Sequence, residues 1–385
     1  MRKILQISNY IYPHIGGIEQ IAREIANAIS DDPDFEQKVI CFNEDAQDNG
    51  YECRRGETVR DIVDGVEVIR CGCFTKKASQ SLSFTFGREL KKVLDSFDPD
   101  IVIFHYPNPF QAMYLLRYLK KDARLIVYWH LDIVKQKVLG KLFHGQSMRL
   151  LKRAEKVVAT SPLYIDGSPY LRKFRNKCIV IPNCINEERL TANDDIMQRV
   201  RRIKEENKDK VICFGIGRHI PYKGFTYLIQ ASKYLDDRFR IYIGGKGELT
   251  ESLMEEAAGD EKIHFLGRID DEELLAYYMA MDILCFPSIT KNEAFGIALA
   301  EGMYFGKPAV TFNIPGSGVN YVSINNETGL EVPNGDSKAF AEAIQRLSED
   351  KALYDKLGEA AERRVKENFL NSQFRKNLSS LISSL

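Results

Sequence analysis

The segment VICFGIGRHIPYKGFTYLIQASKYL, residues 211–235, decides the fold. It starts with an apolar run of strand length, turns at glycines, and continues with apolar residues at helical spacing. The same alternation fills nearly the whole chain, which predicts parallel sheets joined by crossover helices. Because the alternation starts afresh near residue 211, we expect an α/β protein with two successive doubly wound units.

Short apolar runs mark the expected strands of the first unit, at 3–8, 37–42, 66–70, 101–105, 125–129, 156–159 and 178–181. The strands expected in the second unit are 211–216, 239–244, 263–266, 283–286, 308–312 and 329–332. Amphipathic spacing predicts helices at 19–30, 88–97, 111–121, 224–235, 249–258, 272–281, 298–305 and 337–349. We expect the units to join near 182–190, a surface helix before residue 210, and one or two helices over 351–385.

Length and composition indicate the class of protein. The chain has 385 residues, more than a typical single core, and its 54 basic and 54 acidic side chains cancel, so we expect no nucleic-acid partner. None of the eight cysteines forms a CxxC pair, and no cluster has metal-ligand spacing, so we expect reduced buried thiols and no metal. No signal peptide and no bilayer-spanning apolar run is present, which predicts a cytoplasmic protein.

Glycines and polar residues gather where the expected strands end, and open α/β sheets bind ligands at those ends. In the first unit these residues are Gly16, Gly17, His105, His130 and Asp132. Paired glycines let a backbone approach an anion at a helix start, and a histidine orients a hydroxyl or shares a proton. A plain turn and a histidine bonded to the backbone are the structural alternatives.

The second unit has two cations in its first strand-to-helix turn. Arg218 follows Gly217, and Lys223 precedes the expected helix; Gly244 ends the next strand. An arginine fork and a lysine point charge beside a helix start suit a diphosphate. A solvated surface pair is the alternative.

Two glutamates flank the start of another expected helix in the second unit. Glu293 lies in the loop before the helix and Glu301 lies inside it, about 2.2 turns further on. The free N–H groups of 295–297 and the positive end of the helix dipole add donors between them. This segment can hold two different parts of one ligand, although two ordinary surface glutamates are the alternative.

The chain resembles the retaining glycosyltransferases of family 4, whose motifs it matches in order at Gly16-Gly17, His130, Arg218 with Lys223, and Glu293-x7-Glu301. The resemblance covers nearly the whole chain and is greatest over 211–335. It implies the GT-B fold, in which two Rossmann-like domains face each other across a cleft. The stretch 129–136, WHLDIVKQ, is similar to members that build bacterial surface polysaccharides such as lipopolysaccharide or capsule.

The resemblance also implies domain boundaries. Residues 1–184 would form an acceptor-side domain, completed by a C-terminal helix of about 366–385, and residues 185–365 would bind the nucleotide sugar. The chain departs from the family pattern at Cys184, where glycine is usual, and at His219-Ile220. Neither change removes a charged donor-site group.

The resemblance assigns a role to each candidate residue. Glu293 would bind the hydroxyls of the donor sugar, Glu301 would bind the ribose, and Arg218 and Lys223 would neutralise the leaving diphosphate. His130 would touch the transferred sugar. The predicted catalytic residues are His130, Arg218, Lys223 and Glu293; the donor-binding residues are Gly16, Gly17, Gly217, Gly244, Leu266, Gly267, Arg268, Ala294, Phe295, Gly296, Ile297 and Glu301; and those on the acceptor side are His105 and Asp132.

The implied activity is transfer of a sugar, with retention, from a UDP-, GDP- or dTDP-linked donor to a glycan or polyprenyl-linked glycan, without metal or cofactor. Two alternatives are a sugar-nucleotide 2-epimerase of the same fold and a non-catalytic sugar-nucleotide-binding subunit. The Glu293-x7-Glu301 element favours transfer over epimerisation, and the complete set of charged donor-site residues argues against a non-catalytic subunit.

Residues 135–156 carry seven Lys or Arg side chains and one Glu, with leucines between them. Such a segment can bind the anionic inner face of the cell membrane and bring the enzyme to a lipid-linked acceptor. A solvated helix is the alternative.

Overall fold

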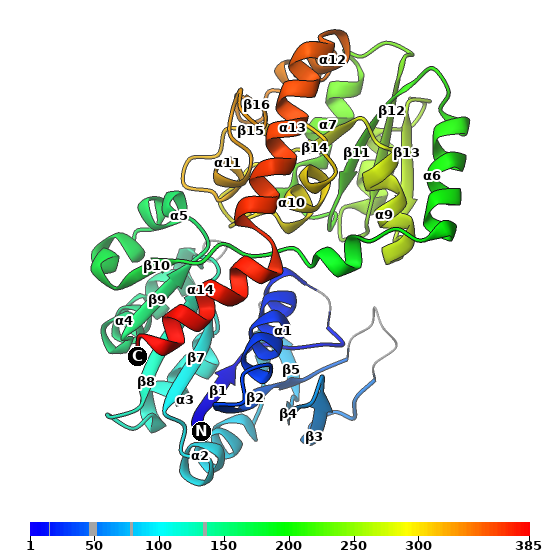
Figure 1. Cartoon of the computed structure of the whole chain (residues 1–385). Coiled ribbons are helices and arrows are strands. Elements are labelled where there is room, and N and C mark those ends of the chain that lie inside the picture. The colour runs from blue at the N-terminus through cyan, green and yellow to red at the C-terminus, as the bar shows by residue number, and fades with distance from the viewer. Residues whose placement is uncertain (15, 46–51, 78–79, 134–136) are drawn as a thin grey trace. The chain divides into compact units, whose positions relative to one another are not determined.

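A computed structural model describes residues 1–14, 16–45, 52–77, 80–133 and 137–385. The chain forms two compact units, each built on a largely parallel sheet (Figure 1). Unit 1 comprises Met1–Ile181 with Phe374–Leu385, and unit 2 comprises Pro182–Gln373.

Unit 1 contains a sheet in the order β10-β9-β8-β7-β1-β2-β4-β3. Its strands are β1 (Arg2–Ile7), β2 (Phe35–Asn43), β3 (Val59–Val63), β4 (Val66–Gly72), β7 (Ile101–Tyr106), β8 (Arg124–Trp129), β9 (Lys156–Ala159) and β10 (Cys178–Val180), with a separate hairpin of β5 (Thr75–Lys77) and β6 (Gln80–Leu82). Its helices are α1 (Gly17–Ser30), α2 (Phe86–Ser96), α3 (Pro109–Tyr118), α4 (Lys137–Arg153), α5 (Pro162–Gly167), η1 (Leu171–Lys177) and most of α14 (Asn371–Ser383). The strand order reverses between β1 and β7, which makes a switch point there.

Unit 2 contains a wholly parallel sheet in the order β13-β12-β11-β14-β15-β16. Its strands are β11 (Val211–Ile216), β12 (Phe239–Gly244), β13 (Ile263–Gly267), β14 (Ile283–Phe286), β15 (Ala309–Phe312) and β16 (Gly329–Val332). Its helices are η2 (Glu187–Leu190), α6 (Asp194–Glu206), η3 (Pro221–Lys223), α7 (Phe225–Ser232), α8 (Thr250–Glu256), α9 (Asp271–Ala280), α10 (Ile297–Tyr304), α11 (Val319–Val322), α12 (Ser337–Glu349) and α13 (Lys351–Asn368). The switch point of this sheet lies between β11 and β14.

The predicted α/β class is confirmed, and most expected elements occur within a few residues of their predicted bounds. The edge strand β3 was not predicted, and it runs antiparallel to β4. Asp64 and Gly65 form the connecting turn with φ values of 49° and 82°. An Asp-Gly pair between alternating residues is a hairpin signal, because both turn positions require positive φ.

The basic segment 135–156 forms α4 over most of its length. Residues 134–136, which include Lys135, lie outside the described residues. Leu150 and Leu151 are fully buried, so these two leucines are part of the core of unit 1 and not of a membrane-facing surface. Within the described parts of the chain, the helices are too short or too polar to cross a bilayer.

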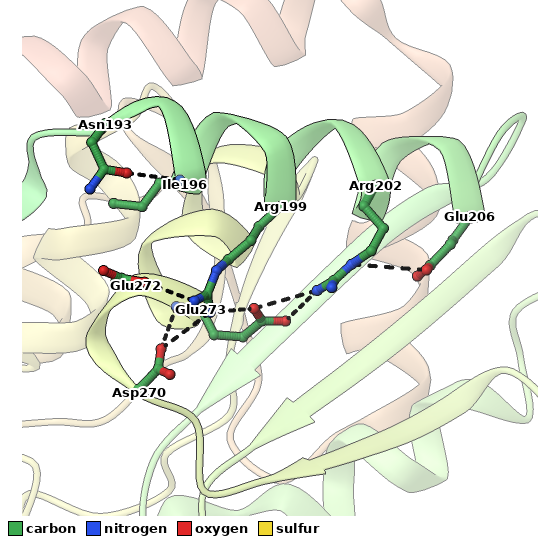
Figure 2. Close-up of polar contacts among 8 residues, drawn as sticks. All are labelled: Asn193, Ile196, Arg199, Arg202, Glu206, Asp270, Glu272 and Glu273. Atoms are coloured by element: carbon green, nitrogen blue, oxygen red, sulfur yellow. Dashed lines mark hydrogen bonds and ion pairs between the residues drawn. The ribbon is translucent and has the colours of Figure 1, made fainter.

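Two kinds of contact hold α6 on α9. The buried face of α6 consists of Ile196, Val200 and Ile203. On the adjoining surface, Arg199 pairs with Asp270, Glu272 and Glu273 at the start of α9, and Arg202 pairs with Glu273 and Glu206 (Figure 2). Most of these side chains are exposed, and Arg199 and Glu273 are partly exposed, so water screens the pairs, and we expect the apolar face to contribute more stability.

Replacing Ile203 by Ala should therefore lower the free energy of unfolding by about 2–5 kcal/mol, the usual loss for a buried isoleucine. Arg199→Ala should cause a smaller decrease in melting temperature. Thermal unfolding followed by far-ultraviolet circular dichroism compares the two variants. A larger decrease for Arg199→Ala would show that the ion pairs dominate.

Candidate functional site

Two turns meet at the switch point of unit 2. One follows β11 and contains η3; the other follows β14. The backbone N–H of Ile289 donates to the carbonyl of Tyr222 at 2.9 Å and so joins the turns. Gly224 has a φ of 66°, and a Cβ there would lie 2.1 Å from the carbonyl oxygen of Pro287. A side chain at this position would push the two turns apart.

Lys223 and Glu293 form an ion pair across these turns. The Nζ of Lys223 lies 2.5 Å from Oε2 of Glu293, and the side chains are only 14% and 12% exposed. The hydroxyl of Ser288 donates to the same carboxylate oxygen at 3.1 Å, and Nζ also lies 5.2 Å from the centre of the Phe286 ring. Exclusion of water strengthens the attraction between the charges. The structure therefore brings together two predicted site residues that lie far apart in sequence.

The loop from Glu293 to Gly296 packs against the turn after β15. The hydroxyl of Ser317 donates to the carbonyl of Glu293. Gly318 packs against the loop so closely that a Cβ would lie 1.9 Å from the carbonyl oxygen of Ala294. Gly296 has a φ of 95° and is the N-cap of α10, so the helix starts at Ile297. The first N–H groups of a helix have no acceptor within it, which makes this start a place for an anion or a hydroxyl.

Glu301 lies within α10 and has a partner of its own. The hydroxyl of the fully buried Tyr278, on α9, donates to Oε2 of Glu301 at 3.0 Å. Burial raises the pKa of Glu301, while this hydrogen bond and the charge of Arg189 oppose the rise. Glu293 and Glu301 therefore sit in different surroundings, one paired with a cation and the other with a phenol.

The carboxyl ends of β11, β12 and β13 are linked through their glycines. The N–H of Gly217 donates to the carbonyl of Gly244 at 3.1 Å, and that of Gly245 donates to the carbonyl of Gly267 at 2.7 Å. Arg218 is exposed beside this row, as is Arg268. Leu266 is partly exposed. The residues predicted to bind the diphosphate and the base thus lie at the carboxyl ends of these strands of the unit 2 sheet.

In unit 1, Gly16 and Gly17 lie at the start of α1. Gly16 is the N-cap with extended backbone, and Gly17 is the first helical residue. The loop before them is anchored by the buried Arg70, whose Nη2 donates to the carbonyl of Tyr12 at 2.6 Å. Arg23 lies over the Tyr12 ring at 4.5 Å.

His105 and His130 are bonded to each other, 2.8 Å apart between Nδ1 and Nε2. Burial lowers the pKa of His105 to about 3 and that of His130 well below its ordinary value. Oδ1 of Asp132 accepts from Nε1 of Trp129 at 3.0 Å and from the hydroxyl of Ser168 at 2.7 Å. The two histidines are therefore hydrogen-bonded to each other, and the Asp132 carboxylate is hydrogen-bonded to Trp129 and Ser168.

Three supporting residues were not predicted: Ser288, Ser317 and Tyr278. The sequence signal for Ser317 is the glycine-rich PGSG that follows β15, a typical strand-end turn. Tyr278 has no local signal, because a tyrosine in an amphipathic helix usually belongs to the core. Among the described residues, no three His, Cys, Asp or Glu side chains are grouped to hold a metal ion.

Two family models match successive parts of the chain. The model for Glycosyltransferase Family 4 matches residues 15–189, and that for Glycosyl transferases group 1 matches residues 197–364. D-rhamnosyltransferase WbpZ of Pseudomonas aeruginosa is 30% identical over 373 residues, which covers 96% of this chain and 92% of the relative. O-antigen chain mannosyltransferase C of Escherichia coli is 30% identical over 372 residues, or 95% and 94% of the two chains.

Solved structures agree on the fold. Sucrose-phosphate synthase from Thermosynechococcus elongatus superposes with a TM-score of 0.81 at 20% identity and covers 100% of this chain and 99% of its own. HepE from Anabaena, solved with UDP and glucose, gives a TM-score of 0.78 at 16% identity over 100% of both chains. The predicted family and GT-B fold are confirmed: the chain belongs to the group 1 glycosyltransferases of family 4, enzymes that transfer sugars.

Proposed function

We propose that this enzyme transfers a hexose or 6-deoxyhexose, with retention, from a nucleotide diphosphate sugar to a glycan or lipid-linked glycan acceptor of a cell-surface polysaccharide. The observation that carries the proposal is the buried Lys223–Glu293 pair at the switch point of unit 2. The names of the two relatives, a D-rhamnosyltransferase and an O-antigen mannosyltransferase, support a sugar of the manno series and an O-antigen acceptor.

The cations of unit 2 act on the leaving group. As the glycosidic bond breaks, the sugar becomes oxocarbenium-like and negative charge grows on the departing diphosphate. Arg218 offers a planar fork and Lys223 a point charge, and the start of α10 adds N–H donors and a positive dipole end. Together these groups stabilise the diphosphate, so the proposal needs no metal ion.

The two glutamates hold the two ends of the donor. Glu293 accepts hydrogen bonds from hydroxyls of the sugar, next to the N–H groups of Phe295, Gly296 and Ile297, and Glu301 accepts from the ribose. Lys223 contacts the first carboxylate directly and therefore couples sugar binding to diphosphate binding. Ala294 and the edge formed by Gly217, Gly244, Leu266, Gly267 and Arg268 complete the donor site, with the base beside the last three.

Unit 1 contributes to the same reaction. In this proposal Gly16 and Gly17 bring an open backbone to the donor phosphates and the acceptor, and His130 touches the transferred sugar. His105 and Asp132 support the acceptor side. Support for these roles comes from their place at the carboxyl ends of β7 and β8 and at the start of α1.

The direct test is transfer from defined donors. Guanosine, uridine and thymidine diphosphate sugars are incubated with a polyprenyl-diphosphate-linked acceptor, and products are detected by mass spectrometry. We expect transfer of mannose or rhamnose, and one-bond carbon–hydrogen coupling at the anomeric carbon should show the same configuration as the donor. An inverted product would contradict retention, and no transfer from any donor would contradict the activity.

Glu293→Gln should lower kcat/KM by at least about 100-fold, because the neutral amide no longer matches the charge of Lys223 or the sugar hydroxyls. The substitution keeps the size of the side chain and an oxygen for Ser288. Initial rates of transfer measure the loss, and the melting temperature checks the fold. The matched control is Glu342→Gln on α12, which should keep full activity. Equal activity of the two variants would refute the role of Glu293.

Replacing both Arg218 and Lys223 by Ala should raise the dissociation constant of the nucleoside diphosphate by about 100-fold or more, since each loses a charge-assisted hydrogen bond. Isothermal titration calorimetry measures it. The nucleoside without phosphates should bind both proteins equally weakly, which separates a phosphate effect from a misfolded site. Lys351→Ala on α13 is the control for loss of a surface cation. An unchanged dissociation constant would contradict the assignment.

A further inference from the structure

His105 and His130 form a buried pair at the carboxyl ends of β7 and β8. Nδ1 of His105 lies 2.8 Å from Nε2 of His130, and the two rings are within 10° of parallel. Their exposed fractions are 1% and 4%. One proton occupies a hydrogen bond between two such nitrogens, so one ring donates it and the other accepts it.

Both imidazoles are neutral at pH 7, because burial lowers the pKa of each. The ring of Tyr128 lies against both, with centroids 5.7 Å from His105 and 5.0 Å from His130. A neutral imidazole has one N–H and one acceptor nitrogen. The direction of the shared hydrogen bond therefore determines the tautomer of both rings.

The second nitrogen of His105 indicates this direction. Its Nε2 is buried and has no hydrogen-bond partner within the described part of the chain. If Nδ1 of His105 accepted the proton, Nε2 would be a buried N–H without an acceptor. If Nδ1 donates, Nε2 is only an unpaired acceptor. In protein backbones, buried N–H groups without a partner are rarer than unpaired acceptors, and the same preference in an imidazole favours donation by His105.

We propose that His105 is a positioning residue, which donates its Nδ1 proton to Nε2 of His130 and so holds His130 in the tautomer with its proton on Nδ1. His130 then offers an N–H donor at Nδ1. This inference rests on the proposed function for its meaning: His130 gives a hydrogen bond to an oxygen of the transferred sugar, and its Nδ1 does not accept the proton of the acceptor hydroxyl.

The tautomer can be measured without any substrate. In the full chain labelled with ¹⁵N-histidine, two-bond nitrogen–proton spectra distinguish a protonated ring nitrogen from a bare one, and loss of a signal set in His130→Gln assigns His130. We expect both His105 and His130 to carry their proton on Nδ1 at pH 7.5. A proton on Nε2 of His130 overturns the proposal.

Substitution of His105 tests the consequence. Asn keeps an N–H donor near the place of Nδ1, whereas Leu removes it. We expect His105→Asn to retain kcat within about two-fold, and His105→Leu to lower kcat by about three- to ten-fold with little change in KM, the effect of one hydrogen bond. The Leu variant should also show mixed tautomers for His130.

Equal kcat values in the Asn and Leu variants overturn the positioning role. Melting temperatures identify a variant that does not fold, and in that case the tautomer of the unmodified enzyme still decides the proposal. Absence of sugar transfer by the unmodified enzyme overturns the proposed function. In that case the nitrogen–proton spectra alone test the tautomer of His130.

Discussion

The ion pair between Lys223 and Glu293 ties together the part of unit 2 on which its candidate chemistry depends. It joins the turn after β11 to the loop before α10 and excludes most of the water from both charges. The turns around this ion pair approach each other closely, and they can do so because Gly224 and Gly318 have no side chain. A buried charge without its partner is costly, so the pair holds cation and carboxylate in one place and keeps the start of α10 beside them.

In unit 1, side-chain amides make the contacts at the switch point. Asn108 caps α3 by accepting from the N–H of Gln111 at 2.9 Å, and its Nδ2 donates to Asn9 at the end of β1. The amide of Gln111 donates to the carbonyl of Ser8 at 2.8 Å. These contacts connect β1 to β7 where the strand order reverses. The glycine turn lies between β1 and α1, and the histidine pair lies at the carboxyl ends of β7 and β8.

The arginines of unit 2 lie in two different surroundings. Arg199 and Arg202 are occupied by the acidic start of α9, where exposure to water weakens their contribution. Arg218 is exposed at a strand end, and the proposed function assigns its planar fork to the donor diphosphate. The distinction depends on the surroundings of each guanidinium. Its intrinsic charge is the same in every case.

The sequence by itself determined the alternation of strands and helices, and with it the two largely parallel sheets, because apolar period and turn residues are local properties. It also placed Arg218, Lys223 and Glu293 in strand-end turns. Only the tertiary structure decided the partners: Lys223 with Glu293, Tyr278 with Glu301, and Asp132 with Trp129 and Ser168. It also buried Leu150 and Leu151. These pairings follow from strand order and helix packing, which bring distant segments together and cannot be read from local spacing.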